Sequence, residues 1–223
     1  MNYQSLEDGL AVMEELSFAL TGKWQRTVSD AAAFTQVIAA VNTSSRDDVT
    51  IILNGSFAAE SVMFTGGAAK TIALRGEGAN RTITNSGDAE IFTVPAGITL
   101  VLDNNLVLDS NKKKAWLVNV MGGTLVMKDG STLRRSGSVG VYIGNGNFTM
   151  SGGTISRNTA SGYGGGVYVS SIGYFGKIGG TIDATNSARY GRVAYVMSGN
   201  KKRDSAAGPG VTLDSRIPGQ PWE

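Results

Sequence analysis

A short phrase recurs along this chain about every 25 residues, and it constrains the fold more than any other feature. In each copy, a mostly apolar run is followed by a turn of Gly, Asn, Asp or Ser, and then by a second short apolar run. The first run ends on Leu74, Leu102, Met127, Met150 and Ile178. The second run has its apolar residue at Ile83, Leu108, Leu133, Ile155, Ile182 and Leu213. A repeat of this length without a helical pattern in each unit excludes helical solenoids and is typical of a parallel β-solenoid.

The repeat predicts stacked coils of three short strands each. A third strand precedes the first in several units, as in ValTyrVal at 167–169. Coils stacked about 4.8 Å apart place equivalent residues in rows, so the two series above are expected to form two interior rows. A β-sandwich also has short strands and frequent turns, but it would not repeat one phrase in register. We expect a helical cap or leader over residues 1–43, the solenoid over 44–215 and a tail over 216–223.

The segment SDAAAFTQVIAAVN, residues 29–42, predicts a helix that covers the first coil. Ser29 is the expected N-cap, and apolar side chains recur at helical spacing at Phe34, Val37, Ile38 and Val41. Such a cover is needed because an open solenoid end exposes unpaired strand edges. Residues 4–20 show a weaker apolar stripe, which indicates either a second capping helix or a disordered leader.

The composition excludes several classes of function. The 223 residues include no Cys and no His, which excludes thiol nucleophiles, disulfides and Ser-His-Asp triads and nearly all zinc, copper and haem sites. We therefore expect no cofactor and no metal. The formal net charge of +2 gives no electrostatic argument for nucleic acid. No apolar run approaches the roughly 20 residues of a membrane-spanning helix.

The N-terminal segment does not have the pattern of a secretory signal. It carries Glu7, Asp8, Glu14 and Glu15, where a signal peptide is basic and then apolar. Either no signal exists or the sequence begins after it.

Two stretches carry a resemblance to known families. The helix at 29–42, then TIILNG at 50–55, then Gly-rich turns and short strands resemble right-handed parallel β-helix proteins of the pectin-lyase-like type, over about residues 27–215. The phrase FTMSGGTISRNTASGYGGGVYV, residues 148–169, is similar to Gly-rich repeat proteins of bacterial surfaces, such as adhesins of the polymorphic outer-membrane-protein kind.

The resemblance implies an all-β fold, a right-handed parallel β-helix of about six or seven coils with an N-terminal capping helix. It implies a non-enzymatic structural or adhesive module, located at the cell surface or outside the cell. The expected partner is a polysaccharide or a protein of a host or cell surface.

The resemblance also implies an alternative, because this fold carries polysaccharide lyases and glycoside hydrolases. Glycoside hydrolysis needs two carboxylates about 5–10 Å apart. Asp103 and Asp129 lie at equivalent corners of adjacent coils and are the candidate pair. Both lie in turn sequences, where Asp is favoured for backbone reasons, so we expect no catalysis. Asp109 aligns with Arg134, and we expect a salt bridge between them.

Four tyrosines are the candidate ligand-binding residues. Tyr142, Tyr168 and Tyr195 each lie between two core-type residues, so we expect them to point outward from three successive coils. An exposed aromatic row suits the C–H faces of sugar rings. The Gly-rich segment SGYGGG at 161–166, which contains Tyr163, would let a ligand approach the backbone closely. The other explanation is cross-strand pairing that stabilises the sheet by about 0.2–1 kcal/mol per pair.

A row of threonines suggests a remote alternative, ice binding. The row is interrupted by Val107 and consists of Thr82, Thr132, Thr154, Thr181 and Thr212. Thr is also an ordinary outward residue of strands, and the uneven coil lengths argue against the flat surface that ice binding needs.

Overall fold

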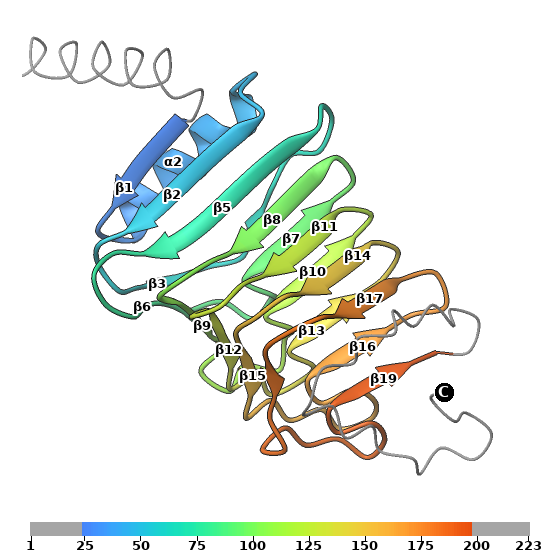
Figure 1. Cartoon of the computed structure of the whole chain (residues 1–223). Helices are drawn as coiled ribbons and strands as arrows, with labels where there is room; N and C mark the ends of the chain where they lie inside the picture. The colour runs from blue at the N-terminus through green and yellow to red at the C-terminus, as the bar shows by residue number, and fades with distance from the viewer. Residues whose placement is uncertain (1–23, 198–223) are drawn as a thin grey trace, which may run out of the picture.

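The computed structural model describes residues 24–197, which form three sheets (Figure 1). Sheet A contains β1 (Trp24–Val28), β2 (Asp48–Leu53), β5 (Lys70–Gly76), β8 (Ile98–Leu102), β11 (Thr124–Met127), β14 (Asn147–Met150) and β17 (Tyr174–Lys177). Sheet B contains β3 (Phe57–Ala59), β6 (Arg81–Asn85), β9 (Leu106–Asp109), β12 (Thr132–Arg134), β15 (Thr154–Ser156) and β18 (Thr181–Ile182). Sheet C contains β4 (Val62–Met63), β7 (Phe92–Pro95), β10 (Val118–Met121), β13 (Val141–Ile143), β16 (Val167–Val169) and β19 (Ala194–Val196).

All the pairings between these strands are parallel, and each strand pairs with the strand one coil away. The chain therefore passes from sheet A to sheet B to sheet C and back again, which makes a parallel β-solenoid of about seven turns. The fold that the repeat predicts is confirmed.

The two predicted interior rows run along the solenoid. In sheet A, Leu74, Leu102, Met127 and Met150 are in register and fully buried. In sheet B the predicted row is also in register and buried, and its members are Ile83, Leu108, Leu133, Ile155 and Ile182. Leu213, predicted as the next member, lies outside the described residues.

The prediction that Ile178 is the fifth member of the sheet A row is wrong. Phe175 pairs with Phe148, with ring centroids 5.0 Å apart, and this pairing places Lys177 opposite Met150. Lys177 is only 7% exposed, whereas Ile178 is 53% exposed. A shift of one residue reverses the face on which a strand residue lies, so the stacked phenylalanines decide which residue points inward.

The N-terminal end contains a strand that the sequence did not predict. β1 pairs with β2 and is the outermost strand of sheet A, and the helix α2 (Ala31–Thr43) follows it. The N-cap is Asp30 rather than the predicted Ser29: the Asp30 carboxylate accepts a hydrogen bond from the Ala33 N–H at 2.9 Å, and the Ser29 hydroxyl donates to Asp30. A carboxylate is an equally good cap and also favours the positive end of the helix dipole.

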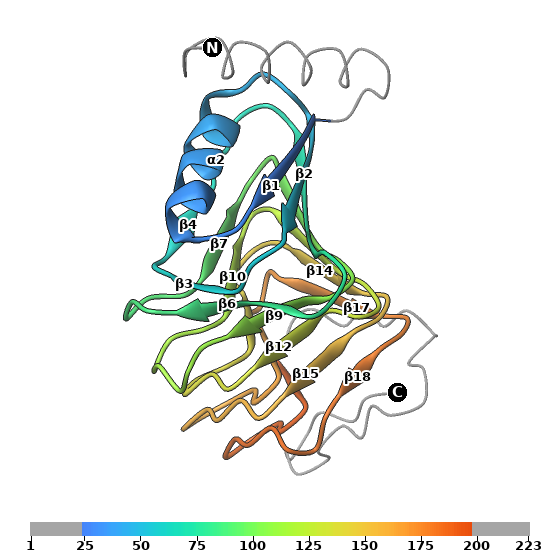
Figure 2. The same ribbon diagram turned by 90° about the vertical axis from the view of Figure 1, so that its left-hand side faces the viewer.

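The helix covers the first coil as predicted. Phe34, Ile38 and Val41 are buried in the core, and Val37 packs against it. In Figure 2, α2 lies beside β1 at the same end of the solenoid, near β3 and β4. The second helix or leader considered for residues 4–20, and the tail over 216–223, lie outside the described residues.

A buried polar row holds the loops between sheets B and C in register. The Asn158 amide oxygen accepts a hydrogen bond from the Ser136 N–H at 2.9 Å, and Asn158 Nδ2 donates to Asn186 Oδ1 at 3.0 Å. Asn186 Nδ2 donates to the Ile155 carbonyl at 2.8 Å, and Ser136 Oγ donates to the Ala115 carbonyl at 2.7 Å. Since buried polar groups are costly unless they are paired, this row fixes the loops that carry much of the candidate site.

Candidate functional site

The predicted tyrosine row lies on the outer face of sheet C. Tyr142, Tyr168 and Tyr195 are the middle residues of β13, β16 and β19, and they are in register. The residues on either side of each tyrosine point toward the core, so the phenols point outward as predicted. The rings of Tyr142 and Tyr168 have centroids 5.2 Å apart and planes 5° apart, and those of Tyr168 and Tyr195 are 5.5 Å and 17° apart.

Three further rings extend this row at its two ends. Trp116, in the loop before β10, stacks on Tyr142 with centroids 4.2 Å apart and planes 9° apart. Tyr163 lies 4.6 Å from Tyr195 at a tilt of 46°, and Tyr190 stacks on Tyr163 at 5.1 Å. We call the six residues the aromatic stack: Trp116, Tyr142, Tyr168, Tyr195, Tyr163 and Tyr190. Tyr163 was predicted as a separate ligand contact, and the structure joins it to the row.

Tyr190 has a sequence signal that the prediction missed. Tyr163 and Tyr190 are each followed by a glycine and each precede a row tyrosine by five residues. The two glycines, Gly164 and Gly191, have φ of +67° and +62°, a region that glycine enters without strain. The repeated Tyr-Gly turn thus places both loop tyrosines on the same side of sheet C. Trp116 has no such signal, because it reaches the row from a loop of different sequence.

The ring faces in the middle of the stack are covered by other rings. Tyr142 lies between Trp116 and Tyr168, and Tyr168 lies between Tyr142 and Tyr195. A sugar ring therefore cannot pack on the faces of Tyr142 or Tyr168 in this arrangement. These two residues present their ring edges and hydroxyl groups to a ligand. Each aromatic pair also stabilises the sheet, by about 0.5–1.5 kcal/mol beyond the area it buries.

The hydroxyl group of Tyr168 stays protonated at neutral pH. Burial raises the pKa of Tyr168 above its ordinary value of 10.0, and the phenols of Tyr142, Tyr195 and Tyr163 raise it further, because neighbouring phenolate charges would repel each other. The Tyr168 hydroxyl lies 3.5 Å from the sulfur of Met197. The hydroxyl donates its one proton to this sulfur, so toward a ligand it acts as an acceptor, and as a donor only when the weak bond to Met197 is broken.

The strands under the stack are uncharged, and at the loop end of the stack the Arg189 guanidinium lies 5.2 Å from the centre of the Tyr190 ring. None of the six sheet C strands in the described part of the chain contains a charged residue. Large apolar side chains are exposed at or just beyond the ends of these strands, at Met63, Met121, Ile172 and Met197. The half-buried tyrosines of β13, β16 and β19 and the exposed Met121 and Met197 thus form an apolar strip on the outer face of sheet C, whereas the outward residues of β7 and β10 are the buried polar Thr93 and Asn119.

No protein-family model, curated protein or solved structure matches this chain significantly. The parallel β-solenoid therefore stands on the structure itself, and the expected kinship with pectin-lyase-like proteins or with adhesins stays a prediction. Within residues 24–197, no helix is long and apolar enough to cross a membrane. The same residues contain no group of three or more His, Cys, Asp or Glu side chains placed to hold a metal ion.

The predicted salt bridge between Asp109 and Arg134 is present on sheet B. Arg134 Nε lies 2.8 Å from Asp109 Oδ2, and Arg135, which was not predicted, also binds this carboxylate at 2.8 Å. Burial alone would raise the pKa of Asp109, but hydrogen bonds from Arg135, the Asn111 N–H and Arg134 outweigh it and lower the pKa. The carboxylate is therefore held as an ion by two cations, which is a structural arrangement and not that of a catalytic acid.

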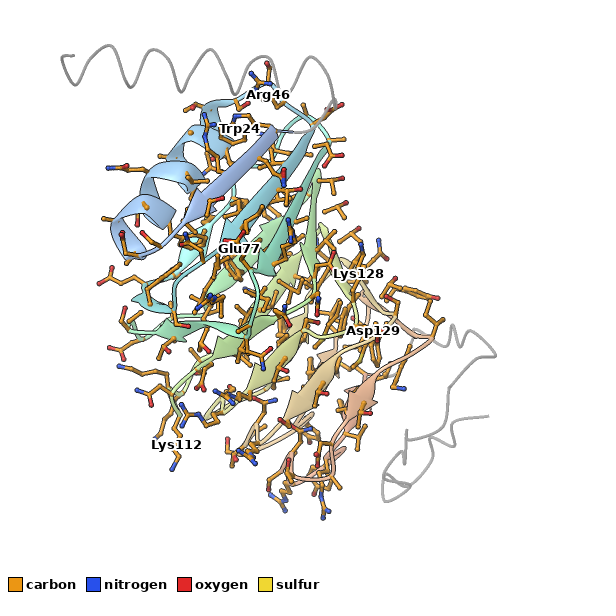
Figure 3. The ribbon with its side chains drawn as sticks, turned by 60° about the vertical axis from the view of Figure 1, so that its left-hand side comes forward. Trp24, Arg46, Glu77, Lys112, Lys128 and Asp129 are labelled. Atoms are coloured by element: carbon orange, nitrogen blue, oxygen red, sulfur yellow. The ribbon has the colours of Figure 1, made fainter. Side chains whose placement is uncertain are left out.

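The carboxylates considered for an enzyme lie at the corner between sheets A and B, where Figure 3 labels Lys128 and Asp129. Asp103 follows Leu102 as Lys128 follows Met127, so the residue equivalent to Asp103 on the next coil is a lysine. Lys128 Nζ lies 3.4 Å from Asp103 Oδ2, and Asp129 is one position further along. Asp103 is thus paired with a cation, and its role as half of a catalytic pair with Asp129 stays a prediction.

The threonine row has the predicted register on the outer face of sheet B. Thr82, Val107, Thr132, Thr154 and Thr181 align on successive coils. Thr212 lies outside the described residues. Ice binding by this row stays a remote prediction.

Proposed function

We propose that this chain is a non-enzymatic binding module of a cell-surface or secreted protein, and that it holds an extended polysaccharide along the aromatic stack. The observation that carries the proposal is the stack itself, six rings in contact on the outer face of a sheet whose described strands contain no charge. The surface location follows the family resemblance and is part of the proposal.

The apolar core of the fold is formed without the residues of this strip. The interior rows already bury apolar side chains in every coil. Contiguous exposed apolar surface on a protein commonly marks an interaction site, and here Met121 and Met197 widen the strip beside the tyrosines.

The chemistry of the strip fits a ligand with recurring hydroxyl groups. The phenols of Tyr142, Tyr168 and Tyr195 recur every 5.2–5.5 Å along the solenoid, and each can donate and accept a hydrogen bond. A polysaccharide chain lying along the stack would present hydroxyl groups to these phenols and its C–H groups to the methionines and ring edges. A ligand without repeating polar groups would use the row less well.

A glycan array with the purified protein tests the proposal, followed by titration of the best ligand. Tyr168→Phe keeps the stacking and removes one hydroxyl, so we expect binding weaker by about 2- to 10-fold, the value of one neutral hydrogen bond. The triple Tyr→Ser variant at 142, 168 and 195 should abolish binding. Tyr174→Ser is the matched control, because Tyr174 lies outward on sheet A, and it should bind as the parent does. If the triple variant binds like the parent, the tyrosine row only stabilises the sheet.

A further inference from the structure

The positive charge of the described chain is concentrated in its later coils. Residues 24–110 contain five Lys and Arg and nine Asp and Glu, whereas residues 111–197 contain ten Lys and Arg and two Asp and Glu. The small net charge of the whole sequence therefore hides an asymmetry between two parts of the solenoid. Charge of one sign gathered on one part of a surface raises the local concentration of ligands of the opposite sign.

Eight of these ten cations lie along one side of the solenoid, at the corner between sheets B and C. They lie at the end of β12 or in the loops that follow β9, β12, β15 and β18, and we call them the basic edge: Lys112, Lys113, Lys114, Arg134, Arg135, Arg157, Arg189 and Arg192. The same strand ends and loops contain two carboxylates, Asp109 and Asp183. Four successive coils thus carry an excess of more than one positive charge per coil.

Half of the basic edge is exposed and unpaired. Arg134 and Arg135 share the Asp109 carboxylate, and Lys113 binds Asp88 at 3.2 Å. Four other cations are exposed and make no side-chain hydrogen bond or ion pair within residues 24–197: Lys112, Lys114, Arg157 and Arg192. In Figure 3, Lys112 points away from the ribbon at this edge. These four side chains are free to bind anionic groups from solvent.

Three cations of the edge have an unusual backbone conformation. Lys112, Arg135 and Arg157 have φ of +63°, +58° and +57°. They lie on successive coils, because the Lys112 N–H donates to the Arg135 carbonyl at 2.7 Å and the Arg135 N–H donates to the Ser156 carbonyl at 3.3 Å. Residues with a Cβ are strained at such φ, and nine described glycines occupy positive φ in this chain. Long cationic side chains at a bend where glycine fits better indicate that the side chains are needed there.

The loops of the basic edge also carry three rings of the aromatic stack. Lys114 is two residues before Trp116, and the loop that contains Arg157 also contains Tyr163. Arg189 directly precedes Tyr190, and its guanidinium lies 5.2 Å from the centre of that ring. A ligand that lies along the aromatic stack therefore has the basic edge on one side.

We propose that the polysaccharide held by the aromatic stack is a sulfated one, and that the basic edge binds its sulfate groups. Lys and Arg form charge-assisted hydrogen bonds with oxyanions, which are stronger than those between neutral groups. This inference rests on the proposed function and names the class of polysaccharide that the site selects.

The density of positive charge favours sulfate esters over other anionic groups. A sugar unit of an extended chain is about as long as one coil is thick, and a polyuronate carries only one carboxylate per sugar. Sulfated chains carry more than one acidic group per sugar and so match an excess above one charge per coil. A single-stranded nucleic acid binds largely by stacking its bases on aromatic faces, and other rings cover both faces of Tyr142 and Tyr168.

The test uses the whole chain and calorimetric titration at about 0.15 M salt, where weak long-range attraction is screened. The probes are heparin, the same chain with its sulfates removed, polygalacturonate and single-stranded DNA. We expect heparin to bind the parent at least about 10-fold more tightly than each of the others, because several exposed ion pairs of about 0.2–1 kcal/mol add up. The triple variant Lys112→Gln, Arg157→Gln, Arg192→Gln should weaken heparin binding about 10-fold or more for the same reason. Arg75→Gln is the control, because Arg75 lies on β5 of sheet A, and it should bind as the parent does.

Arg157→Gly separates binding from folding. Glycine relieves the strain at φ +57° and Arg157 makes no side-chain bond to the described residues, so the variant should melt no lower than the parent. We expect its heparin binding to be weaker by about 2- to 5-fold, the value of one exposed ion pair. A lower melting temperature with unchanged heparin binding would show that Arg157 serves the fold and not a ligand.

The outcomes also separate the basic edge from the proposed function. If Tyr168→Ser loses heparin binding while the triple variant binds like the parent, the basic edge is wrong and the aromatic stack stands. If the triple variant loses binding while Tyr168→Ser does not, the basic edge stands and the role of the stack is wrong. Desulfated heparin or DNA that binds as tightly as heparin would overturn the assignment to sulfate groups, and so would a parent that binds no heparin.

Discussion

The first and the last described coils of the solenoid differ in the residues that lie at them. At the N-terminal end, α2 lays Phe34 over the first coils, with its ring 5.3 Å from that of Phe57 and 6.4 Å from that of Phe92. At the other end, β17, β18 and β19 are the outermost of the described strands in their sheets. The ends differ most clearly in the surroundings of two buried lysines, Lys70 near the helix and Lys177 in the last described coil.

Both lysines are buried, but their hydrogen-bond partners differ. Lys70 Nζ donates to the carbonyl of Val41 and, at 2.9 Å, to that of Ser44, where the last carbonyls of α2 lack helical partners and the helix dipole is negative. Lys177 Nζ is buried without any hydrogen-bond partner. Burial lowers the pKa of both lysines. One cation therefore completes a cap, and the other is an unpaired charge at an edge.

The inward-facing row of sheet A has a cation at each of its described ends. The row in sheet A begins with Arg26, aligned with Ile51, and ends with Lys177, aligned with Met150. Charged side chains that point inward at a sheet edge discourage another chain from pairing there. The middle of the row is apolar and its ends are charged. The same inward position therefore favours an apolar side chain in the middle coils and a cation in the outermost described strands.

Moving a charge from the end of this row to its middle should have the largest effect. Met127→Lys places an ammonium group where both neighbours in the row, Leu102 and Met150, are fully buried. An unpaired buried charge costs several kcal/mol, so we expect the variant to be unfolded at 25 °C by circular dichroism. Thr124→Lys is the control, because it points outward from the same strand and should change the free energy of unfolding by about 0.5 kcal/mol or less. A folded Met127→Lys variant with a parent-like melting temperature would contradict the comparison.

The sequence predicts the middle of the solenoid better than its ends. In the middle, apolar residues recur at the same position of each repeat. The rows through Leu102 and Leu133 therefore follow from spacing alone. At the ends this pattern weakens, because the fold places cations inward. The prediction therefore chose Ile178 over Lys177, and it missed β1, whose central residue Arg26 aligns with the interior position Ile51.

In the candidate site, the residues on regular strands were predicted and most of those in loops were missed. The row of Tyr142, Tyr168 and Tyr195 follows from the repeat, because regular strands carry it. Trp116 joins from the loop before β10, and no spacing in the sequence indicates that it stacks on Tyr142.

Replacing each buried lysine by methionine should shift stability in opposite directions. Lys177→Met removes an unpaired buried cation, and we expect a gain of about 1–3 kcal/mol in the free energy of unfolding. Lys70→Met removes two charge-assisted hydrogen bonds and leaves the carbonyls of Val41 and Ser44 without this donor, so we expect a loss of about 1–3 kcal/mol. Urea denaturation measures both changes.

The comparison of the ends also predicts a change in association for Lys177→Met. The variant should self-associate at concentrations where the parent is monodisperse by light scattering, because the edge loses its inward charge. Shifts of the same sign for the two lysine variants would show that the environments of Lys70 and Lys177 do not differ as described.

The smallest expected effect is a pH dependence of the Lys177→Met gain. Burial lowers the pKa of Lys177 in the folded protein below the ordinary value of 10.5, which we take for the unfolded chain. Between these two pKa values the unfolded state binds more protons, so the free energy of unfolding of the parent rises as the pH rises through this window. The methionine variant lacks this contribution, and its advantage over the parent should therefore shrink as the pH approaches 10.5.

The raised pKa of Tyr168 acts in the opposite direction above pH 10.0, because the unfolded phenol releases its proton first. Both proteins contain Tyr168, so its effect cancels in the difference between their unfolding free energies, measured with urea at about pH 7, 8, 9 and 10. A constant difference across this range would mean that Lys177 titrates as it does in the unfolded chain, and that its charge is not confined in the folded protein.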